Sequence, residues 1–343
     1  MRKVVIHRAG GYERLTIEEA PTPTPGPGEL RIDVSAVGVN YADCVVRMGL
    51  YASAREFVGW PITPGFEVAG VVSAVGPGVM TWPIGQDVIA VTRFGGYASQ
   101  VVVPATQVFA APAGLSATQA AGLPAVFLTA DHALHALARP AAGEWVLVHS
   151  AAGGVGSALV QLARLAGCHV VAVVGAPHKV AAAQALGATL VIDRSVADLW
   201  PAARGIAPDG FAAVFDANGV ATLRASYRHL APAGRLVVYG FHSMLPRRGG
   251  RPNWLKLAWD YLRTPWFSAM DLVNGNKSVM GFNLSYLFHR GDLLAGAMAR
   301  ILGGFSAGAL RMPAVTVYPL AEVGRAHADL ESGQTVGKLV LVP

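Results

Sequence analysis

A strand-like apolar run, Trp145–His149, leads directly into the turn sequence SAAGGVGS. In this turn Ala151, Gly153 and Gly156 occupy the G-x-G-x-x-G frame, with alanine in place of the first glycine. The second position of such a frame lets the backbone approach a pyrophosphate, and the third lets the following helix pack closely on the sheet. Free N–H groups at the helix N-terminus then bind the phosphates. A plain glycine-rich turn is the alternative, but the strand before and the helix and second apolar strand after the turn favour a dinucleotide site.

Residues at the end of the next apolar run, His169–Val174, indicate which nucleotide binds. A carboxylate about 20 residues beyond the motif would hold the ribose hydroxyls of NAD, but no acid is present there. Gly175 leaves room for a 2′-phosphate, and Lys179 and Arg194 are cations that could bind it. Lys179 could also be an ordinary solvated helix residue. The missing acid favours NADPH.

Other reactive residue types do not form recognisable sets. Ser150 lacks the G-x-S-x-G sequence of a nucleophile elbow, which argues against a hydrolase. The 10 histidines show no H-x-H or H-E-x-x-H grouping. Two cysteines, Cys44 and Cys168, are too few for a disulfide framework or a four-cysteine zinc site. A reduced, cytoplasmic setting fits this composition.

Composition indicates a folded chain of more than one domain. Of its 343 residues, 53% are hydrophobic and 14% are charged. The formal charge of +6 comes from dispersed basic residues, so anions are attracted but no nucleic-acid stripe is evident. The N-terminal sequence has no long apolar core, so we expect no signal peptide. No uninterrupted apolar run reaches the roughly 18 residues that a membrane span needs.

The elements that must position the glycine turn change character along the chain. Residues Leu30–Ala36 alternate between apolar and polar, as in a half-buried strand. Three similar segments follow, at Val68–Val75, Asp87–Thr92 and Tyr97–Val103, and predict a barrel-like β domain. From Trp145 onward, short runs that are apolar on both faces alternate with helical stretches, which predicts a doubly wound parallel α/β sheet. We therefore predict an α/β fold with a barrel-like domain and a Rossmann sheet.

Several motifs resemble the medium-chain dehydrogenase/reductase superfamily over nearly the whole chain. They are Pro25–Glu29, Gly38–Asp43, Pro64–Glu67, Gly85–Val88 and the AAGGVG turn. The resemblance implies a GroES-like catalytic domain from residues 1–124 and 286–343, and a Rossmann NADPH-binding domain from residues 125–285.

Within this resemblance, the residue at position 66 decides whether a zinc ion can take part in the chemistry. Zinc-dependent alcohol dehydrogenases of the superfamily have a Cys where Asn40 stands and a His where Phe66 stands. Catalytic zinc needs three protein ligands with lone pairs, and a phenyl ring offers none. The four-cysteine zinc lobe is also absent. The chain resembles instead the zinc-free quinone oxidoreductase branch, and the segment Asn276–Leu287 resembles the vesicle amine transport protein homologue group within it. Arg194 departs from that branch, which often has Tyr there, but Arg preserves anion binding.

This resemblance implies the remaining site residues and no metal ligand. Asn40 and Tyr51 are predicted to be catalytic, by hydrogen bonding to a developing oxyanion and, for Tyr51 or a water molecule, by donating the proton. Tyr51 could also be a packed loop aromatic, and Asn40 a turn residue. The predicted cofactor-binding residues are Thr129, Ala152, Gly153, Gly154, Val155, Gly175, Lys179, Arg194, Asn218, Gly240, Phe241, Phe282, Asn283 and Lys338. Asp43 is predicted to have a structural role.

The resulting functional prediction is NADPH-dependent, zinc-independent hydride transfer to quinones or related apolar conjugated carbonyl compounds, in a dry cleft between the domains. One alternative is an enoyl or alkenal C=C reductase on the same scaffold. A second is a binding or trafficking protein that holds NADPH with little turnover. The resemblance also implies a homodimer through the edge strand Val279–Asn283.

The stretch NWLKLAWDYLRTPWF, residues 253–267, is the remaining unusual segment. Trp254, Ala258 and Tyr261 fall on one helical face, beside the basic residues 247–251. A helix or loop that caps the cleft is the favoured interpretation. The alternative is a surface that binds lipid or a partner protein.

Overall fold

The structure is a computed structural model that describes residues 1–343. The chain divides into two compact units. The first contains Met1–Leu128, Arg247–Arg251 and Leu284–Pro343, and the second contains Thr129–Pro246 and Pro252–Asn283. These limits differ by a few residues from the predicted domain boundaries. In addition, the short segment Arg247–Arg251 belongs to the first unit although both its flanks belong to the second.

The first unit is built on a seven-stranded sheet in the order β14-β15-β3-β4-β5-β7, with β6 also paired to β3. All its pairs are antiparallel except β14 with β15. The strands are β3 (Glu29–Val39), β4 (Glu67–Val75), β5 (Asp87–Val91), β6 (Gln100–Pro104), β7 (Val108–Ala110), β14 (Val315–Pro319) and β15 (Lys338–Val342). Leu30, Ile32 and Val34 are buried in the core, whereas Asp33 and Ser35 are exposed, so the alternation in the sequence is the burial pattern of β3.

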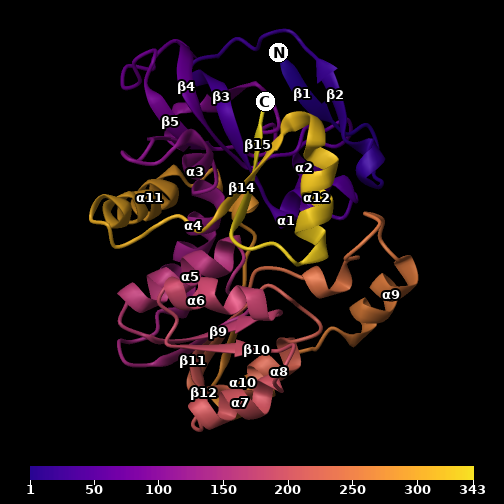
Figure 1. The fold of residues 1–343 in the computed structure, drawn as a ribbon, viewed down its shortest axis with the longest axis vertical. Coiled ribbons are helices and arrows are strands. Elements are labelled where there is room, and N and C mark those ends of the chain that lie inside the picture. The colour runs from indigo at the N-terminus through magenta and orange to yellow at the C-terminus, as the bar shows by residue number, and fades with distance from the viewer. The chain divides into compact units, whose positions relative to one another are not determined.

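Helices and a small ribbon complete this unit. The ribbon pairs β1 (Arg2–Val5) with β2 (Thr16–Glu19). The helices are α1 (Tyr41–Arg47), α2 (Ala52–Phe57), α3 (Ala117–Ala121), α11 (Gly291–Ser306) and α12 (Val323–Ser332). Helix α4 (Pro124–Asp131) and the π-helical segment His132–Ala138 carry the chain into the second unit. In Figure 1 both chain ends lie in the first unit, where β15 from the C-terminal end pairs with β3.

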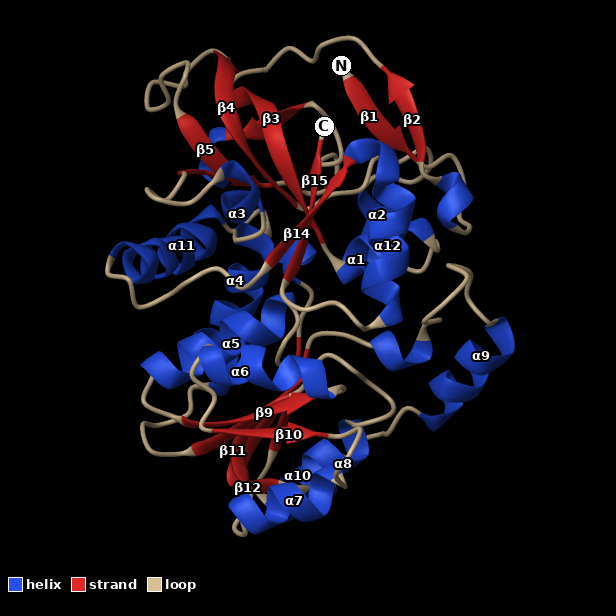
Figure 2. Ribbon diagram, in the orientation of Figure 1, coloured by secondary structure: helices blue, strands red, loops and turns tan.

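The second unit is a six-stranded sheet in the order β10-β9-β8-β11-β12-β13, with every pair parallel. Its strands are β8 (Trp145–Val148), β9 (His169–Val174), β10 (Leu190–Asp193), β11 (Phe211–Asp216), β12 (Leu230–Val238) and β13 (Ser278–Gly281). Figure 2 shows α5 (Gly154–Leu165) and α6 (Val180–Ala185) on one face of this sheet and α7 (Leu199–Ile206) and α8 (Leu223–Arg228) on the other. The predicted doubly wound parallel sheet is confirmed. Every residue of β11 is buried, as expected for a strand covered on both faces.

The predicted helix within residues 253–267 is present as α9 (Trp254–Arg263), and α10 (Ala269–Gly275) follows it. Its apolar side chains are not covered, however. Trp254 is 66% exposed, Leu255 85% and Trp266, just after the helix, 95%. The partly buried side is formed by Leu257 and Asp260 instead. None of the helices is both long enough and apolar enough to cross a bilayer.

Candidate active site

Phe66 lies in an aromatic cluster just before β4. It is 4% exposed, and its ring centroid is 5.2 Å from that of Phe94 and 5.6 Å from that of Tyr51. The preceding residue, Gly65, has φ +108°, and a Cβ there would lie 2.6 Å from the backbone N of Tyr97, so only glycine fits. Phe66 therefore contributes an apolar wall and no metal-binding atom.

Asn40 follows β3 and is the N-cap of α1, and its side chain is held by two buried charged residues. Lys338 Nζ lies 2.6 Å from Asn40 Oδ1, 2.9 Å from the Val39 carbonyl oxygen and 2.7 Å from Glu67 Oε1. Asn40 Nδ2 donates to Glu67 Oε1 at 2.8 Å, and the Ala125 backbone N–H donates to Glu67 Oε2 at 2.7 Å. Lys338 is 3% exposed and Glu67 0%.

These contacts fix which way the Asn40 amide points. An ammonium can only donate, so the atom next to Lys338 must be the amide oxygen. The amide nitrogen then faces Glu67, which accepts one of its two protons. The second Nδ2 proton makes no hydrogen bond within the protein, so it could donate to another acceptor. A rigid donor in a dry site is what stabilisation of a developing oxyanion requires.

Asp43, on α1, fastens the backbone on both sides of this site. Its Oδ2 accepts from the Asn40 N–H and its Oδ1 from the Gly65 N–H, both at 2.8 Å. The carboxyl is fully buried, and burial raises its pKa to about 7 although these donors and nearby Lys338 favour the charged form. The predicted structural role for Asp43 agrees with these contacts.

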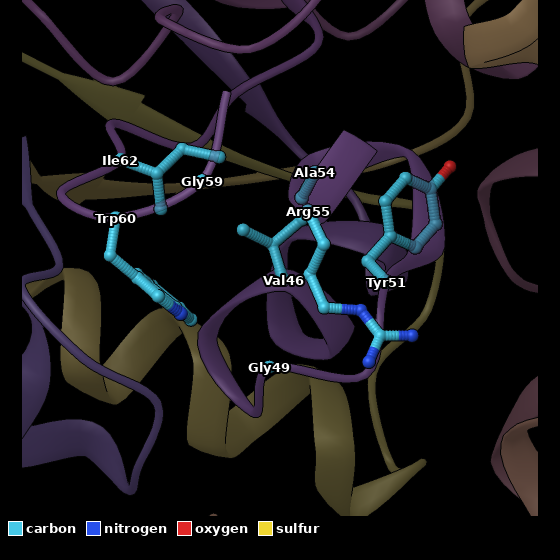
Figure 3. Close-up of a pocket in the computed structure, with 8 residues that line it drawn as sticks. All are labelled: Val46, Gly49, Tyr51, Ala54, Arg55, Gly59, Trp60 and Ile62. Carbon is cyan, nitrogen blue, oxygen red and sulfur yellow. The ribbon is translucent and has the colours of Figure 1, made fainter. Parts of the chain in front are cut away.

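Tyr51 stands at the N-terminus of α2 in the same aromatic cluster, its ring centroid 6.3 Å from that of Phe94. A cavity of about 10 Å³ lies on its other side, between Val46, Arg55 and Trp60. That volume holds about one water molecule, so the cavity is not a substrate site. Figure 3 shows the Tyr51 hydroxyl directed away from Trp60 and Ile62.

In the second unit, the glycine turn has the geometry of a phosphate cradle. The strand β8 ends at Val148, and α5 begins at Gly154 with Gly153 as its N-cap. A Cβ on Gly156 would collide with the Ser150 carbonyl oxygen, so the helix can pack this closely only with glycine. The residues Ala151–Gly153 lie between this strand end and the helix N-terminus, whose N–H groups and dipole favour an anion. The turn fits a pyrophosphate.

The next strand end fits an additional phosphate. A Cβ on Gly175 would lie 3.5 Å from Arg194 Nε and 3.7 Å from Nη2, so the guanidinium borders the space that a side chain here would take. Arg194 is exposed at the end of β10, and Lys179 is partly buried just before α6. No carboxylate occupies this strand end. The arrangement suits a 2′-phosphate better than a bare ribose.

Comparisons with known proteins find relatives that match over the whole chain. A family model of zinc-binding dehydrogenases matches residues 154–300, and a model of the alcohol dehydrogenase GroES-like domain matches residues 26–113. The human synaptic vesicle membrane protein VAT-1 homolog is 35% identical over 100% of this chain and 86% of its own length. A 2-haloacrylate reductase from Burkholderia sp is 32% identical over 99% of this chain and 98% of its own. The solved Escherichia coli quinone oxidoreductase complexed with NADPH superposes with a TM-score of 0.87, at 28% identity and over 100% of both chains.

This chain belongs to the medium-chain dehydrogenase/reductase superfamily, in its zinc-free, quinone-oxidoreductase-like branch. The family resemblance predicted from the sequence motifs is therefore confirmed. The predicted fold class is confirmed as well, with a GroES-like first unit and a Rossmann-like second unit.

The other predicted cofactor residues of this oxidoreductase fall mostly at the carboxyl edge of the parallel sheet. Asn218 follows β11 and accepts from the Ser150 hydroxyl at 3.1 Å. Gly240 and Phe241 follow β12, and a Cβ on Gly240 would lie 2.7 Å from the Ala217 carbonyl oxygen. Phe282 and Asn283 follow β13, and Thr129 lies on α4. This edge is where open α/β sheets bind ligands.

Lys338, which is predicted to bind the cofactor, lies in the first unit with three oxygens within 2.9 Å of its ammonium nitrogen. These contacts orient the Asn40 amide, and cofactor binding by Lys338 stays a prediction. The sequence contains no local signal for this arrangement, since Lys338 and Asn40 are 298 residues apart.

Proposed function

We propose that this oxidoreductase uses NADPH to reduce quinones or related apolar conjugated carbonyl compounds without a metal. The observation that carries the proposal is the Asn40 amide, held by Lys338 and by Glu67, the residue that directly follows Phe66 in the chain. A zinc-dependent enzyme polarises a carbonyl with its metal. In this chain a fixed hydrogen-bond donor, Asn40, would polarise the carbonyl instead. A hydrogen bond is sufficient when the substrate that accepts the hydride is already electrophilic.

Each residue of the proposed site has a defined part in this reaction. NADPH, when bound, supplies the hydride. Asn40 Nδ2 donates a hydrogen bond to the acceptor oxygen on which negative charge develops. Phe66 and Phe94 exclude water and accommodate a flat apolar ring. Tyr51 or a water molecule returns a proton to that oxygen.

The cofactor assignment is supported by the second unit and by a structural neighbour. The turn at Ala152–Val155 would hold the pyrophosphate, and Arg194 with Lys179 the 2′-phosphate beside Gly175. The Escherichia coli quinone oxidoreductase of the same fold was solved with NADPH.

Reduction of an activated C=C bond is the second candidate. Its support is the likeness to a 2-haloacrylate reductase over 99% of this chain. The Asn40 donor would serve equally for an enolate oxygen, because hydride addition to a conjugated C=C bond places charge on the carbonyl oxygen. A binding protein with little turnover, as the likeness to the VAT-1 homolog allows, is a third and less favoured candidate.

We also propose a homodimer that forms through β13. This strand ends the six-stranded sheet and pairs only with β12, so its other edge is available to a second chain. Light scattering in solution tests this proposal, because a monomeric mass at working concentrations would contradict it.

NADPH consumption with a panel of acceptors tests the proposed activity. The panel contains a benzoquinone, a naphthoquinone, an alkenal and an enoyl thioester, each assayed also with NADH. We expect fastest turnover of a quinone with NADPH. Selective turnover of the alkenal or thioester would instead establish the C=C reductase, and tight NADPH binding without any turnover would favour the binding protein.

A further inference from the structure

At the carboxyl edge of the parallel sheet, the buried carboxylate of Asp216 accepts from four donors at the end of β11. Its Oδ1 accepts from the backbone N–H of Asn218 at 2.8 Å and from that of Gly219 at 3.0 Å. Its Oδ2 accepts from the hydroxyl of Thr222 at 2.7 Å and from that of Ser226 at 2.9 Å. Asp216 is 0% exposed, so it holds both the loop after β11 and the start of α8 from the inside.

Two side-chain bonds connect this network to the residues that lead into the glycine turn. The Ser150 hydroxyl donates to Asn218 Oδ1 at 3.1 Å, and His149 Nε2 lies 3.1 Å from Ser226 Oγ. His149 and Ser150 are consecutive residues after β8. The start of the turn is therefore held by two side chains whose partners both bond Asp216.

The backbone of Ser150 has a conformation that residues with a side chain seldom adopt. Its φ is +54°, in the left-handed region, where Cβ crowds the backbone. In this conformation the Ser150 carbonyl oxygen accepts from the Gly153 N–H at 2.9 Å and lies directly against Gly156. The N–H groups in the first turn of α5 have no partner within the helix and remain available to an anion. The bond to Asn218 offsets the cost of this left-handed conformation.

We propose that Ser150 and Asp216 are positioning residues for the dinucleotide. The Asp216 carboxylate fixes Asn218, the Asn218 amide holds Ser150 in its left-handed conformation, and Ser150 gives the glycine turn the shape that accepts a pyrophosphate. Without these bonds a smaller fraction of the molecules has the binding-competent turn, and the apparent Kd rises as that fraction falls. This proposal rests on the NADPH binding in the proposed function, but not on which acceptor is reduced.

A serine hydrolase triad is the competing interpretation of Ser226, His149 and Asp216. In such a triad one imidazole nitrogen contacts the serine and the other contacts the carboxylate. In this protein the same Nε2 of His149 lies 3.1 Å from Ser226 Oγ and 3.8 Å from Asp216 Oδ2, and Nδ1 has no hydrogen-bond partner. Ser226 is also 0% exposed, so its hydroxyl is closed to a substrate. The three residues hold the strand ends and do not form a nucleophile.

Ser150→Ala and Ser150→Gly separate the hydroxyl from the backbone conformation. Alanine keeps a Cβ in the left-handed region but cannot bond Asn218, whereas glycine adopts this region without strain. We expect the Kd for NADPH, measured by fluorescence without any acceptor, to rise about 5-fold in Ser150→Ala, the effect of one lost hydrogen bond. It should stay within about 2-fold of the wild type in Ser150→Gly. An unchanged Kd in Ser150→Ala, or equal rises in both variants, would overturn the proposal.

Ser268→Ala is the matched control. The Ser268 hydroxyl accepts from the Asp271 N–H at 3.1 Å at the start of α10, so this variant also loses one serine hydrogen bond in the second unit. We expect the control to bind NADPH with the wild-type Kd. A rise in Kd as large as that of Ser150→Ala would overturn the proposal, because a general loss of stability would then explain both.

A double-mutant cycle tests the link through Asn218. Asn218→Ala removes the acceptor of the Ser150 hydroxyl, so Ser150→Ala should have little further effect in that background. We expect the NADPH Kd of the double variant to lie within about 2-fold of that of Asn218→Ala. If the two single effects multiply instead, the Ser150 hydroxyl acts independently of Asn218 and the proposal fails.

Hydrogen exchange tests whether Asp216 acts on the turn as well as on its own loop. Asp216→Asn keeps the shape of the side chain, but an amide has only one oxygen and cannot accept from all four donors. We expect about 5-fold faster exchange in the peptide that contains residues 149–157. Unchanged exchange there, with or without a change in residues 217–226, would overturn the proposal. Since neither Kd nor exchange requires an acceptor, these changes in a protein that reduces no acceptor would refute only the proposed function.

Discussion

At the scale of single residues, the Asn40 amide is oriented by two partners. The Lys338 ammonium can only donate and faces Oδ1, and the Glu67 carboxylate can only accept and faces Nδ2. Lys338 also neutralises Glu67, which is fully buried. The same ammonium group thus serves both the geometry and the electrostatics of the site.

Lys338→Met should therefore damage the fold and the site together. It leaves the Glu67 carboxylate buried without a cation, which typically destabilises a protein by about 3–5 kcal/mol. Urea unfolding measures this loss. The double variant Lys338→Met with Glu67→Gln should recover part of it, since no buried charge is left unpaired. No recovery would mean that the charge of Glu67 is not the cause.

Asp43 should make stability depend on pH. Burial raises its pKa from 3.8 to about 7, so between these values the unfolded chain has lost the proton that the folded chain keeps. Stability from this group is full below about pH 4 and falls as the pH rises to about 7. Between pH 5 and 8 we expect a loss of about 2–3 kcal/mol in the free energy of unfolding. Asp43→Asn should lack this component, and an identical pH dependence in both proteins would contradict the assignment.

The sequence predicts the site residues that act alone better than those that act in pairs. Phe66 and Asn40 are recognisable because their residue types replace zinc ligands of a known motif. The contact of Lys338 with Asn40 is not, because the two residues are 298 residues apart and meet only in the folded chain.

At the scale of elements, two strand ends and the helices after them form the nucleotide site. The strands β8 and β9 are neighbours and parallel, so the glycine turn and Gly175 lie at the same edge of the sheet. Residue choice at the end of β9 then selects the nucleotide.

Gly175→Asp should reverse the preference for NADPH over NADH. A carboxylate beside Arg194 would neutralise the guanidinium and repel a 2′-phosphate. We expect the Kd for NADPH, measured by fluorescence, to rise at least about 10-fold, with a smaller change for NADH. Gly205→Asp, at an exposed position of α7 with open space around it, is the matched control. Equal losses for both nucleotides in Gly175→Asp would point to damage of the turn instead.

Helix α9 shows where a helical pattern is insufficient. Its periodicity predicts the helix but not the side that packs, because the aromatic residues are exposed and Leu257 is partly buried.

If the aromatic face of α9 is free in solution, the triple variant Trp254→Ser, Leu255→Ser, Trp266→Ser should unfold with a free energy within about 1 kcal/mol of the wild type. A larger loss would support the predicted capping role. Vesicle flotation of the wild type and the triple variant tests lipid contact. Equal flotation of the two proteins would exclude lipid binding by this face of α9.

The short elements of the first unit were the least predictable. The ribbon of β1 with β2 and the three-residue strand β7 have too few residues to show a period. Longer strands such as β3 and β4 overlap the predicted segments, and in the first half of β3 the alternation in the sequence matches the alternation in burial.

At the scale of the whole molecule, the sequence predicts two domains, and the structure divides into two units. The division is predicted by a change in the strands, from alternating apolar and polar residues to wholly apolar runs. A sheet with one buried face needs alternation, whereas a sheet covered on both faces needs apolar residues throughout. The assignment of Arg247–Arg251 to the first unit could not be predicted. It depends on single long-range bonds, such as Arg47 to the Gly250 carbonyl oxygen and Arg251 to Glu13.

The central claim is that a locked amide, without a metal, stabilises the charge that develops during hydride transfer. The most direct test compares wild type with Asn40→Ala on the best acceptor of the panel, with and without a chelator, and measures kcat and the NADPH Kd. We expect kcat to fall about 100- to 1,000-fold in Asn40→Ala, an unchanged NADPH Kd, and no effect of the chelator on either protein. Loss of wild-type activity in the chelator, or full activity of Asn40→Ala, would contradict the account.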